Sequence, residues 1–198
     1  LQISFDDRVL RPRQWTTAQS DWAADLLTQL PDGPVLELCS GAGQIGLLAV
    51  NGSDRRLVCV DANPIACDFV RLNAEANGLA DRVEVRHGWL QGAVHEDERF
   101  PLIVADPPWV PRAETSRFPA DPMLAIDGGN DGLDVARACI GVVADHLARG
   151  GVALLQLGTP DQARALEVEA GAPVGLAVTE VRQFERGVVA RVSRSRRG

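Results

Sequence analysis

Lysine and tyrosine are absent from this sequence, and methionine occurs only once in 198 residues. All 20 basic side chains are therefore arginines, which we interpret as a coding bias and not as a chemical requirement. No apolar run approaches the roughly 20 residues that cross a bilayer, and the first residues lack the apolar core of a secretory signal peptide. We therefore expect no membrane segment and a cytoplasmic location.

The cysteines and histidines of the sequence do not have the spacing of metal ligands either. The four cysteines lie far apart without a CxxC pair, and the three histidines are not spaced as metal ligands: Cys39, Cys59, Cys67 and Cys139, and His87, His95 and His146. Zinc sites and disulfide frameworks both require characteristic spacings. We expect no metal and no disulfide, and we interpret the cysteines as reduced residues of the core.

The composition is that of a globular protein of one domain, with 45% hydrophobic and 24% charged residues. The formal net charge of −7 disfavours broad binding to nucleic acid, because phosphate contacts need a basic face. Four arginines near the end of the chain leave a local phosphate contact open: Arg191, Arg194, Arg196 and Arg197. Because the chain starts at Leu1 and not at Met, the sequence also leaves open whether a recognition domain precedes it.

Strand-like and helix-like segments alternate along most of the chain, which is typical of a parallel sheet with helices on both faces. A first helix is expected between Ser20, a suitable N-cap, and Pro31. Buried strands are expected over residues 34–39, 57–61, 83–86, 102–105 and 152–157, and further helices over residues 44–50, 66–76 and 133–147. The Pro- and Gly-rich residues 107–132 are expected to form a long loop.

The end of the chain predicts a different connection. Two β-branched segments, residues 177–182 and 188–192, flank a short turn at Arg186-Gly187 and predict an antiparallel hairpin at the sheet edge. The tail, residues 193–198, is expected to be frayed. The predicted fold class is α/β, a single Rossmann-like, doubly wound and mostly parallel seven-stranded sheet with a C-terminal antiparallel hairpin. Residues 1–30 would form a lid segment and helix, and residues 31–198 the core, of one domain.

A glycine-rich turn follows the first expected strand. Gly41, Gly43 and Gly46 allow a tight turn and a close approach of a ligand to the backbone. Asp61 ends the next strand, where its carboxylate can accept hydrogen bonds from both hydroxyls of a ribose. Glu37 would repel a pyrophosphate and attract the ammonium of S-adenosylmethionine, unless it turns to solvent or to a helix N-terminus. The pattern predicts a nucleotide cofactor and favours S-adenosylmethionine.

A second motif, Asp106-Pro107-Pro108-Trp109, follows the fourth expected strand. Two consecutive prolines stiffen the backbone and remove two N–H donors, which leaves carbonyl groups free to face a ligand. The acidic side chain of Asp106 and a bare carbonyl of Pro107 can together accept both hydrogens of one NH2 group, while Trp109 offers a flat face for stacking. The motif predicts an acceptor site for a planar NH2 group, with a core-packing role for Trp109 as the alternative.

The two motifs together resemble those of class I S-adenosylmethionine-dependent methyltransferases. Residues 37–46 with Asp61 are similar to motif I and its acidic partner, and residues 106–109 to the [Asn/Asp]-Pro-Pro-[aromatic] motif of enzymes that methylate amide or exocyclic amine nitrogens. The segment Pro12-Arg13-Gln14-Trp15-Thr16 and the stretch at residues 128–133 resemble those of the HemK/PrmC type, the glutamine-N5 methyltransferases of peptide release factors. The likeness runs from Val9 to the final hairpin.

The resemblance implies S-adenosylmethionine as cofactor and assigns two groups of site residues. The catalytic group is Asp106, Pro107 and Trp109, and the cofactor-binding group is Glu37, Ser40, Gly41, Gly43, Gly46, Asp61, Ala62, Trp89 and Thr16. Departures from the family pattern concern Cys39 in place of a glycine, Asp106 in place of the usual Asn, and His87-Gly88-Trp89 in place of an acidic residue at the adenine. The N-terminal helical domain of the family is missing from this sequence.

Other classes of function remain open from the residues alone. An NAD(P)-dependent oxidoreductase explains the glycines and Asp61 but leaves residues 106–109 unexplained, and a methyltransferase-like binding module without activity stays possible. A hydrolase is disfavoured because no nucleophile elbow is present. Among methyl acceptors we rank a protein glutamine of the release-factor type first, then a nucleic-acid base, then a small metabolite. The oligomeric state cannot be predicted.

Overall fold

A seven-stranded sheet organises the computed structural model, which describes residues 1–171 and 174–195. The strand order is β3-β2-β1-β4-β5-β7-β6. The strands are β1 Val35–Leu38, β2 Leu57–Asp61, β3 Val83–His87, β4 Phe100–Ala105, β5 Leu147–Leu157, β6 Leu176–Gln183 and β7 Val188–Arg194. Strands β1 to β5 pair in parallel, whereas β7 pairs antiparallel with both β5 and β6. The predicted fold class is confirmed, with β6 of the hairpin at the sheet edge.

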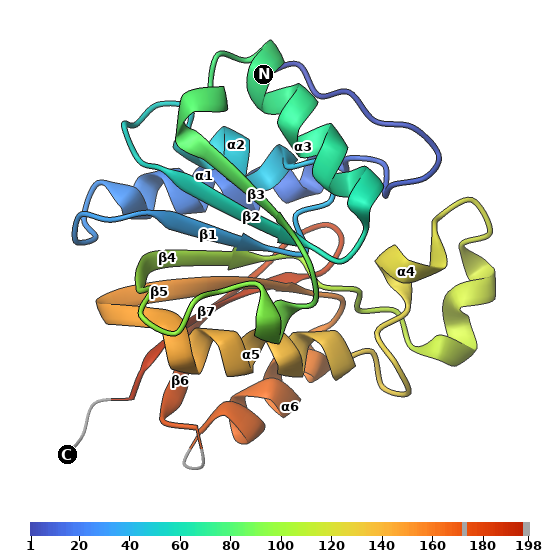
Figure 1. Cartoon of the computed structure of the whole chain (residues 1–198). Helices are drawn as coiled ribbons and strands as arrows, with labels where there is room; N and C mark the ends of the chain where they lie inside the picture. Colours follow the sequence, from blue (N-terminus) through green and yellow to red (C-terminus); the bar gives the residue numbers. More distant parts are fainter. Residues whose placement is uncertain (172–173, 196–198) are drawn as a thin grey trace.

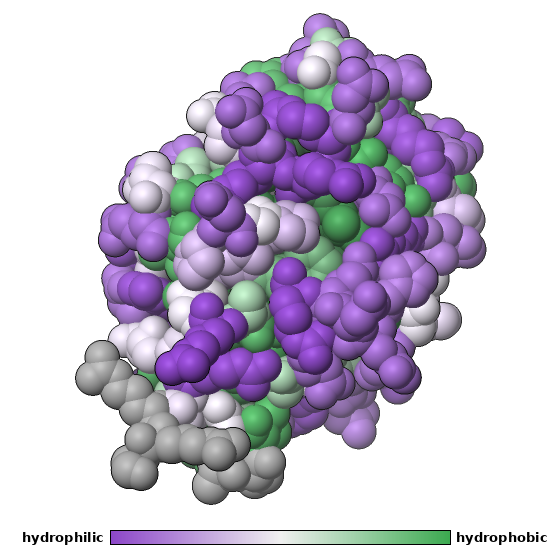
Figure 2. Space-filling view, turned by 60° about the vertical axis from the view of Figure 1, so that its left-hand side comes forward, coloured by the Kyte–Doolittle hydropathy of each residue, from purple (hydrophilic) through white to green (hydrophobic). Residues whose placement is uncertain are grey.

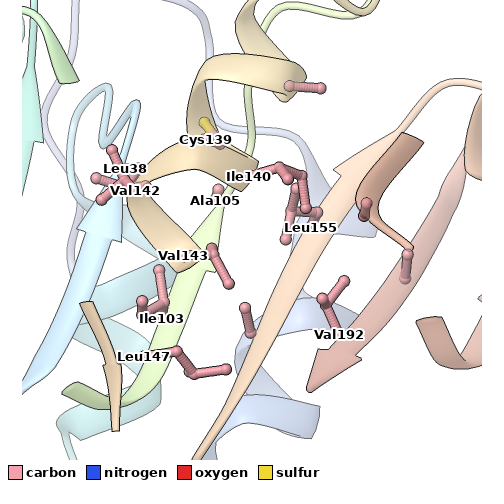
Figure 3. Packing of buried hydrophobic residues seen from close by; sticks show 14 of the residues in the cluster. Leu38, Ile103, Ala105, Cys139, Ile140, Val142, Val143, Leu147, Leu155 and Val192 are labelled. Carbon is pink, nitrogen blue, oxygen red and sulfur yellow. The ribbon is translucent and has the colours of Figure 1, made fainter. Parts of the chain in front are cut away.

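Helices cover both faces of this sheet, as Figure 1 shows. The α-helices are α1 Thr17–Leu27, α2 Gln44–Val50, α3 Pro64–Ala76, α4 Met123–Ile126, α5 Asp134–His146 and α6 Pro160–Ala170. Helices α1, α2 and α3 contribute to one buried apolar cluster, and α5 and α6 to the other. Figure 3 shows the second cluster, in which Cys139 and Val143 of α5 lie over Ala105 and Ile103 of β4. Strands β1 and β4 are fully buried because both of their faces are covered.

Short-range signals explain where two of the helices begin. The Asn63 side chain accepts a hydrogen bond from Ile65 N at 3.0 Å, and Pro64 occupies the first turn of α3. The Thr159 side chain accepts a bond from Gln162 N at 3.1 Å, and Pro160 occupies the first turn of α6. A side-chain acceptor followed by proline satisfies an end-of-helix donor and presets the helical φ angle.

Several sequence predictions of local structure are confirmed and others are wrong. Helix α2 and strand β2 have the predicted bounds. Ser20 is not an N-cap but a buried residue inside α1, which begins three residues earlier, after the short 3-10 helix Gln14–Thr16. The expected loop at residues 107–132 contains the 3-10 helix Arg112–Arg117 and helix α4.

The last third of the chain holds two more corrections. Helix α6 was not predicted, because its polar sequence hides the apolar positions that pack on the sheet. Ser193 and Arg194 are not frayed but end β7, where Arg194 Nη2 donates to Leu147 O at 2.9 Å and to Ala144 O at 3.0 Å. The rest of the predicted tail, residues 196–198 with Arg196 and Arg197, lies outside the described residues.

Two further expectations concern the cysteines and the surface. Cys59, Cys67 and Cys139 are buried, as expected of core residues, whereas Cys39 is half-buried. In the part of the chain that the structure describes, no helix is long and apolar enough to cross a membrane. Figure 2 brings forward the end of the sheet away from α4, and there hydrophobic residues are scattered among hydrophilic ones.

The order of the strands determines where a ligand can enter. The chain runs outward from β1 to β2 and β3, and then crosses back to β4 on the other side of β1. Such a switch point opens a crevice at the carboxyl ends of the two central strands, because the connections leave in opposite directions. Both sequence motifs follow these two ends, and α4 stands beside them in Figure 1.

Candidate active site

The glycine turn lies between β1 and α2 and has left-handed backbone geometry. The φ angles are +52° at Gly41 and +81° at Gly43, and the turn is closed by Gly43 N, which donates to Ser40 O at 2.8 Å. A side chain added at Gly41 would meet nothing within 4 Å, so the backbone there is open to a ligand. The Ser40 side chain is itself buried.

Cys39 shares this left-handed geometry although it is not glycine. Its φ of +56° is the sole positive value among the described non-glycine residues. L-residues pay roughly 1–2 kcal/mol for this conformation because Cβ approaches the following carbonyl oxygen. This cost explains why the family that the sequence resembles has a glycine at this position.

We expect Cys39→Gly to be more stable than Cys39→Ala by about 1 kcal/mol, because only the alanine retains the strained Cβ. Both variants lose the thiol, so the comparison isolates the backbone. Urea unfolding of the two purified proteins measures the difference. Equal stability of the two variants would contradict the assignment of strain to Cys39.

Glu37 lies beneath the glycine turn and not at its surface. Its carboxylate accepts a hydrogen bond from Gly46 N at 2.9 Å and one from Cys59 Sγ at 3.3 Å. Burial, opposed by the bond from Gly46, raises the pKa of Glu37 to about 7. A Cβ at Gly46 would lie 2.4 Å from Glu37 Oε2, so the glycine leaves room for this carboxylate. Of the orientations open from the sequence, toward the ligand, toward solvent or toward a helix N-terminus, the structure has the one toward the N-terminus of α2.

Asp61 connects the glycine turn with the start of α3. Its carboxylate accepts hydrogen bonds from Gly41 N and Asn63 N, both at 2.8 Å. Burial raises the pKa of Asp61, while the bonds from the two backbone N–H groups act in the opposite direction. These bonds fix the carboxylate at the end of β2, where it borders the crevice.

A pocket of about 520 Å³ occupies the crevice. Five sequence-predicted site residues line it: Gly41, Asp61, Ala62, Trp89 and Asp106. Three of the lining side chains are apolar and exposed: Trp89 at 69%, and Met123 and Leu124 of α4 at 53% and 52%. Large exposed apolar side chains around an opening are typical of a ligand site.

Asp106 also lines a second pocket, of about 170 Å³. Its carboxyl group has no hydrogen-bond donor among the described residues, and its enclosure raises its pKa to about 7. The smaller pocket is also lined by Pro107, Trp109 and Thr16. Asp106 is therefore the sole acidic side chain common to the two pockets in the part of the chain that is described.

The structure brings the predicted site residues into three groups. Gly41, Asp61, Ala62, Trp89 and Asp106 line the larger pocket, and Thr16, Asp106, Pro107 and Trp109 line the smaller one. Glu37, Ser40, Gly43 and Gly46 line neither pocket and support the turn from below or behind. Thr16, assigned to the cofactor by the resemblance, thus lies on the side of Asp106 that faces away from the glycine turn.

The mouth of the smaller pocket contains residues that the sequence analysis did not assign. Arg13 Nη2 donates to both carboxylate oxygens of Asp121, at 2.6 and 2.7 Å. The guanidinium carbons of Arg13 and Arg186 lie 5.7 and 5.5 Å from the centre of the Trp15 ring. Arg186 comes from the β6–β7 turn, so the pairing is between segments far apart in the sequence. No local signal could have revealed it.

Comparison with known proteins connects this geometry to a family. The model of the methyltransferase small domain matches residues 15–155, which include both motifs. The chain belongs to this methyltransferase family. Among the described residues no group of three or more histidine, cysteine or acidic side chains could hold a metal ion.

Two curated relatives carry more specific names. A ribosomal protein uL3 glutamine methyltransferase of Burkholderia pseudomallei is 30% identical over 166 residues, covering 77% of this chain and 54% of its own length. A release factor glutamine methyltransferase of Gloeobacter violaceus is 30% identical over 164 residues, covering 79% and 57%. The chain therefore spans little more than half the length of these relatives.

Solved structures confirm the class I methyltransferase fold. The catalytic domain of human METTL16, solved in complex with an RNA hairpin, superposes with a TM-score of 0.76, covering 98% of this chain and 74% of that one. The sequence identity is 16%, so the likeness concerns the fold alone.

Proposed function

We propose that this protein transfers a methyl group from S-adenosylmethionine to a planar NH2 nitrogen, with the side-chain amide of a protein glutamine as the leading acceptor. The observation that carries the proposal is the position of the Asp106 carboxyl between the two pockets. The larger, of about 520 Å³, suits a nucleoside cofactor. The smaller, of about 170 Å³, suits one flat side chain.

The residues of the larger pocket fit S-adenosylmethionine. The open backbone at Gly41 allows close approach, and the fixed carboxylate of Asp61 suits the two hydroxyls of a ribose. Trp89 and Ala62 lie where the adenine would be held, and Trp89 offers its ring for packing. When bound, the cofactor supplies an electrophilic methyl group on a sulfonium centre. A site for NAD(H) would use the same glycines and Asp61 but would leave residues 106–109 without a role.

The acceptor would lie on the other side of Asp106. Its two N–H bonds would be held by the Asp106 carboxylate and by a carbonyl of the rigid Pro107-Pro108 backbone, so that the nitrogen lone pair faces the larger pocket. The role of Asp106 is to orient the nucleophile and not to remove a proton before transfer. Trp109 lines the pocket where a flat group would stack.

Three features favour a glutamine over the other acceptors. The relatives with 30% identity are named as glutamine methyltransferases of a release factor and of a ribosomal protein. The net charge of −7 disfavours an extended contact with RNA. A hydroxyl or thiol acceptor has one hydrogen and would leave an acceptor of the site unpaired, at a cost of about 1–3 kcal/mol. A glutamine on a translation protein also implies a cytoplasmic location.

A labelling assay with the purified chain tests the proposal. Cofactor with a labelled methyl group is incubated separately with a peptide release factor, ribosomal protein uL3, ribosomal RNA and a small-molecule extract. We expect label in one of the two proteins, and no loss of this label when an excess of NAD(H) is added as a competitor. Label in RNA alone would keep the chemistry and exclude the glutamine, and no label in any sample would contradict the proposed function.

The ionisation of Asp106 predicts a pH dependence. The ionised carboxylate accepts a stronger, charge-assisted hydrogen bond than the protonated carboxyl group, and the pKa of about 7 means that the ionised form of Asp106 grows as the pH rises through 7. We expect kcat/KM for the cofactor, which reports groups of the free enzyme, to rise with pH and to level off above about 8. This rise of kcat/KM with pH should be absent in Asp106→Asn. It should persist in Glu37→Gln, because the amide oxygen of the glutamine can still accept the hydrogen bond from Gly46 N. If kcat/KM of Asp106→Asn still rises with pH, the pH dependence belongs to another group.

A further inference from the structure

Two buried glutamines hold the ends of the Asp106-Pro107-Pro108-Trp109 segment. Gln19 of α1 is fully buried, and its Nε2 donates to Ala105 O and to Leu154 O, both at 3.0 Å. Gln162 of α6 is 8% exposed, and its Nε2 donates to Trp109 O at 2.9 Å and to Asp131 O at 3.1 Å. The Oε1 atom of Gln162 accepts from Gly158 N at 2.9 Å. The two glutamines come from helices on opposite faces of the sheet.

These bonds restrain the backbone of the segment, which its own N–H groups cannot do at the two prolines. Pro107 and Pro108 have no N–H group, so the backbone cannot be fixed through donors at its centre. The flanking carbonyls, of Ala105 and Trp109, are instead held by side-chain amides. Among the described residues nothing donates to the carbonyls of Asp106 and Pro107. The two glutamines therefore occupy the end carbonyls and leave the central ones for a substrate.

Glycines pack closely around the same segment. A Cβ at Gly158 would lie 2.3 Å from Trp109 Cε3, one at Gly132 would lie 2.3 Å from Trp109 O, and one at Gly128 would lie 2.7 Å from Pro108 O. Gly128 and Gly132 belong to the glycine-rich stretch that the sequence analysis singled out without a role. Their backbone touches the segment that Gln162 holds, so the stretch and Gln162 form one support.

We propose that Gln162, together with Gln19, is a positioning residue that sets the orientation of the central carbonyls and of Asp106 toward the acceptor. Neither glutamine lines either pocket, so both act through the backbone of the segment. The inference rests on the proposed function for its effect on turnover, but its effect on the backbone can be measured without any substrate.

The sharpest variant is Gln162→Glu, which keeps the side-chain shape and the acceptor for Gly158 N. An ionised carboxylate at this place cannot donate to Trp109 O or Asp131 O and is repelled by both. We expect kcat to fall by about a hundredfold at pH 8, because a misplacement of about 1 Å at a reacting group has an effect of this size. The Kd for S-adenosylmethionine should change less than about twofold, because the larger pocket is not touched.

Lowering the pH provides a signature that a general loss of stability would not give. The introduced carboxyl gains a donor when protonated, so the kcat of Gln162→Glu relative to that of the unchanged protein should rise as the pH falls. Gln162→Met, which has no donor at any pH, should show the loss without the recovery. Glu167→Gln, on the exposed face of the same helix, serves as the control with unchanged kcat.

Hydrogen exchange supplies the readout that is independent of activity. Val110 N donates to Ile126 O at 3.0 Å and Gly128 N to Val110 O at 2.9 Å, and these amides report the order of the supported segment. Both should exchange faster in Gln162→Met and in Gln19→Met, while Gly46 N in the cofactor turn stays protected. Full kcat in Gln162→Glu, or equal losses of kcat and cofactor affinity, would overturn the proposal. The two proposals can fail separately. If the unchanged protein methylates nothing but the variants show the expected faster exchange, the proposed function is contradicted and the positioning of the segment by the glutamines stays supported.

Discussion

Asp106→Ala is expected to lower kcat by about a hundredfold or more while the Kd for S-adenosylmethionine changes less than about threefold. The carboxylate is the sole acidic group shared by the two described pockets, and its loss leaves the acceptor nitrogen free to rotate away from the methyl group. The alanine also removes a carboxyl whose burial is unfavourable, so the fold should not be weakened. Single-turnover kinetics with labelled cofactor measures the rate, and calorimetry measures the affinity.

Asp106→Asn is the matched control for that experiment. Its amide oxygen still accepts one hydrogen bond from the acceptor, so it should retain substantially more activity than Asp106→Ala. An equal loss in the two variants would mean that the charge of Asp106 matters more than its geometry. Full activity in Asp106→Ala would remove Asp106 from the mechanism.

Asp61→Ala is expected to weaken cofactor binding by about 5- to 150-fold, which corresponds to about 1–3 kcal/mol. Two effects act in the same direction. The variant loses the charge-assisted bonds to the ribose, and it frees Gly41 N, which the carboxylate holds at 2.8 Å and which fixes the turn around the ligand. With the cofactor saturating, kcat should be close to that of the unchanged protein, because the acceptor pocket is intact.

Asp61→Asn separates the two effects. The amide oxygen can still accept from Gly41 N, while the bond from Asn63 N is lost because the amide NH2 group only donates, so the loss of affinity should be smaller than in Asp61→Ala. Asp81→Ala, at an exposed position before β3, should bind as the unchanged protein does. Unchanged affinity in Asp61→Ala would place the cofactor elsewhere.

The sequence predicted the parts of the fold that depend on neighbouring residues. Helix α2 follows from the glycine turn and β2 from its apolar run, and both have the predicted bounds. Helix α3 includes the predicted residues 66–76, and the cap at Asn63, which the sequence analysis did not use, sets its start at Pro64. The same reasoning failed at Ser20, because its hydroxyl is a suitable cap in isolation, but tertiary packing continues α1 past it toward Thr17.

The candidate site was predictable where a motif carries it and not where distant residues complete it. Asp61, Trp89 and Asp106 were assigned from their places after strands, and all three line the larger pocket. Gln19 lies 86 residues before the carbonyl it holds at Ala105. No local pattern connects these two positions, so the support of the site became visible only in the structure.

Glu37 illustrates a limit of a different kind. Its charge and place in β1 were read correctly, but a carboxylate there can face either the ligand or the start of α2. Only the packing of Gly46 against it, with Gly46 N donating at 2.9 Å, decides between the two. The carboxylate therefore faces α2 and lines neither pocket, and this position does not fit the predicted contact with the ammonium group of the cofactor.

The position of the transferred methyl group tests the central claim most directly. The protein is incubated with a release factor and S-adenosylmethionine labelled in the methyl group, and the modified peptide is fragmented in a mass spectrometer. The account predicts a single methyl group on the side-chain nitrogen of one glutamine, absent when Asp106→Ala replaces the unchanged protein. A methyl group on an oxygen, sulfur or carbon atom would contradict a site built to hold a planar NH2 group.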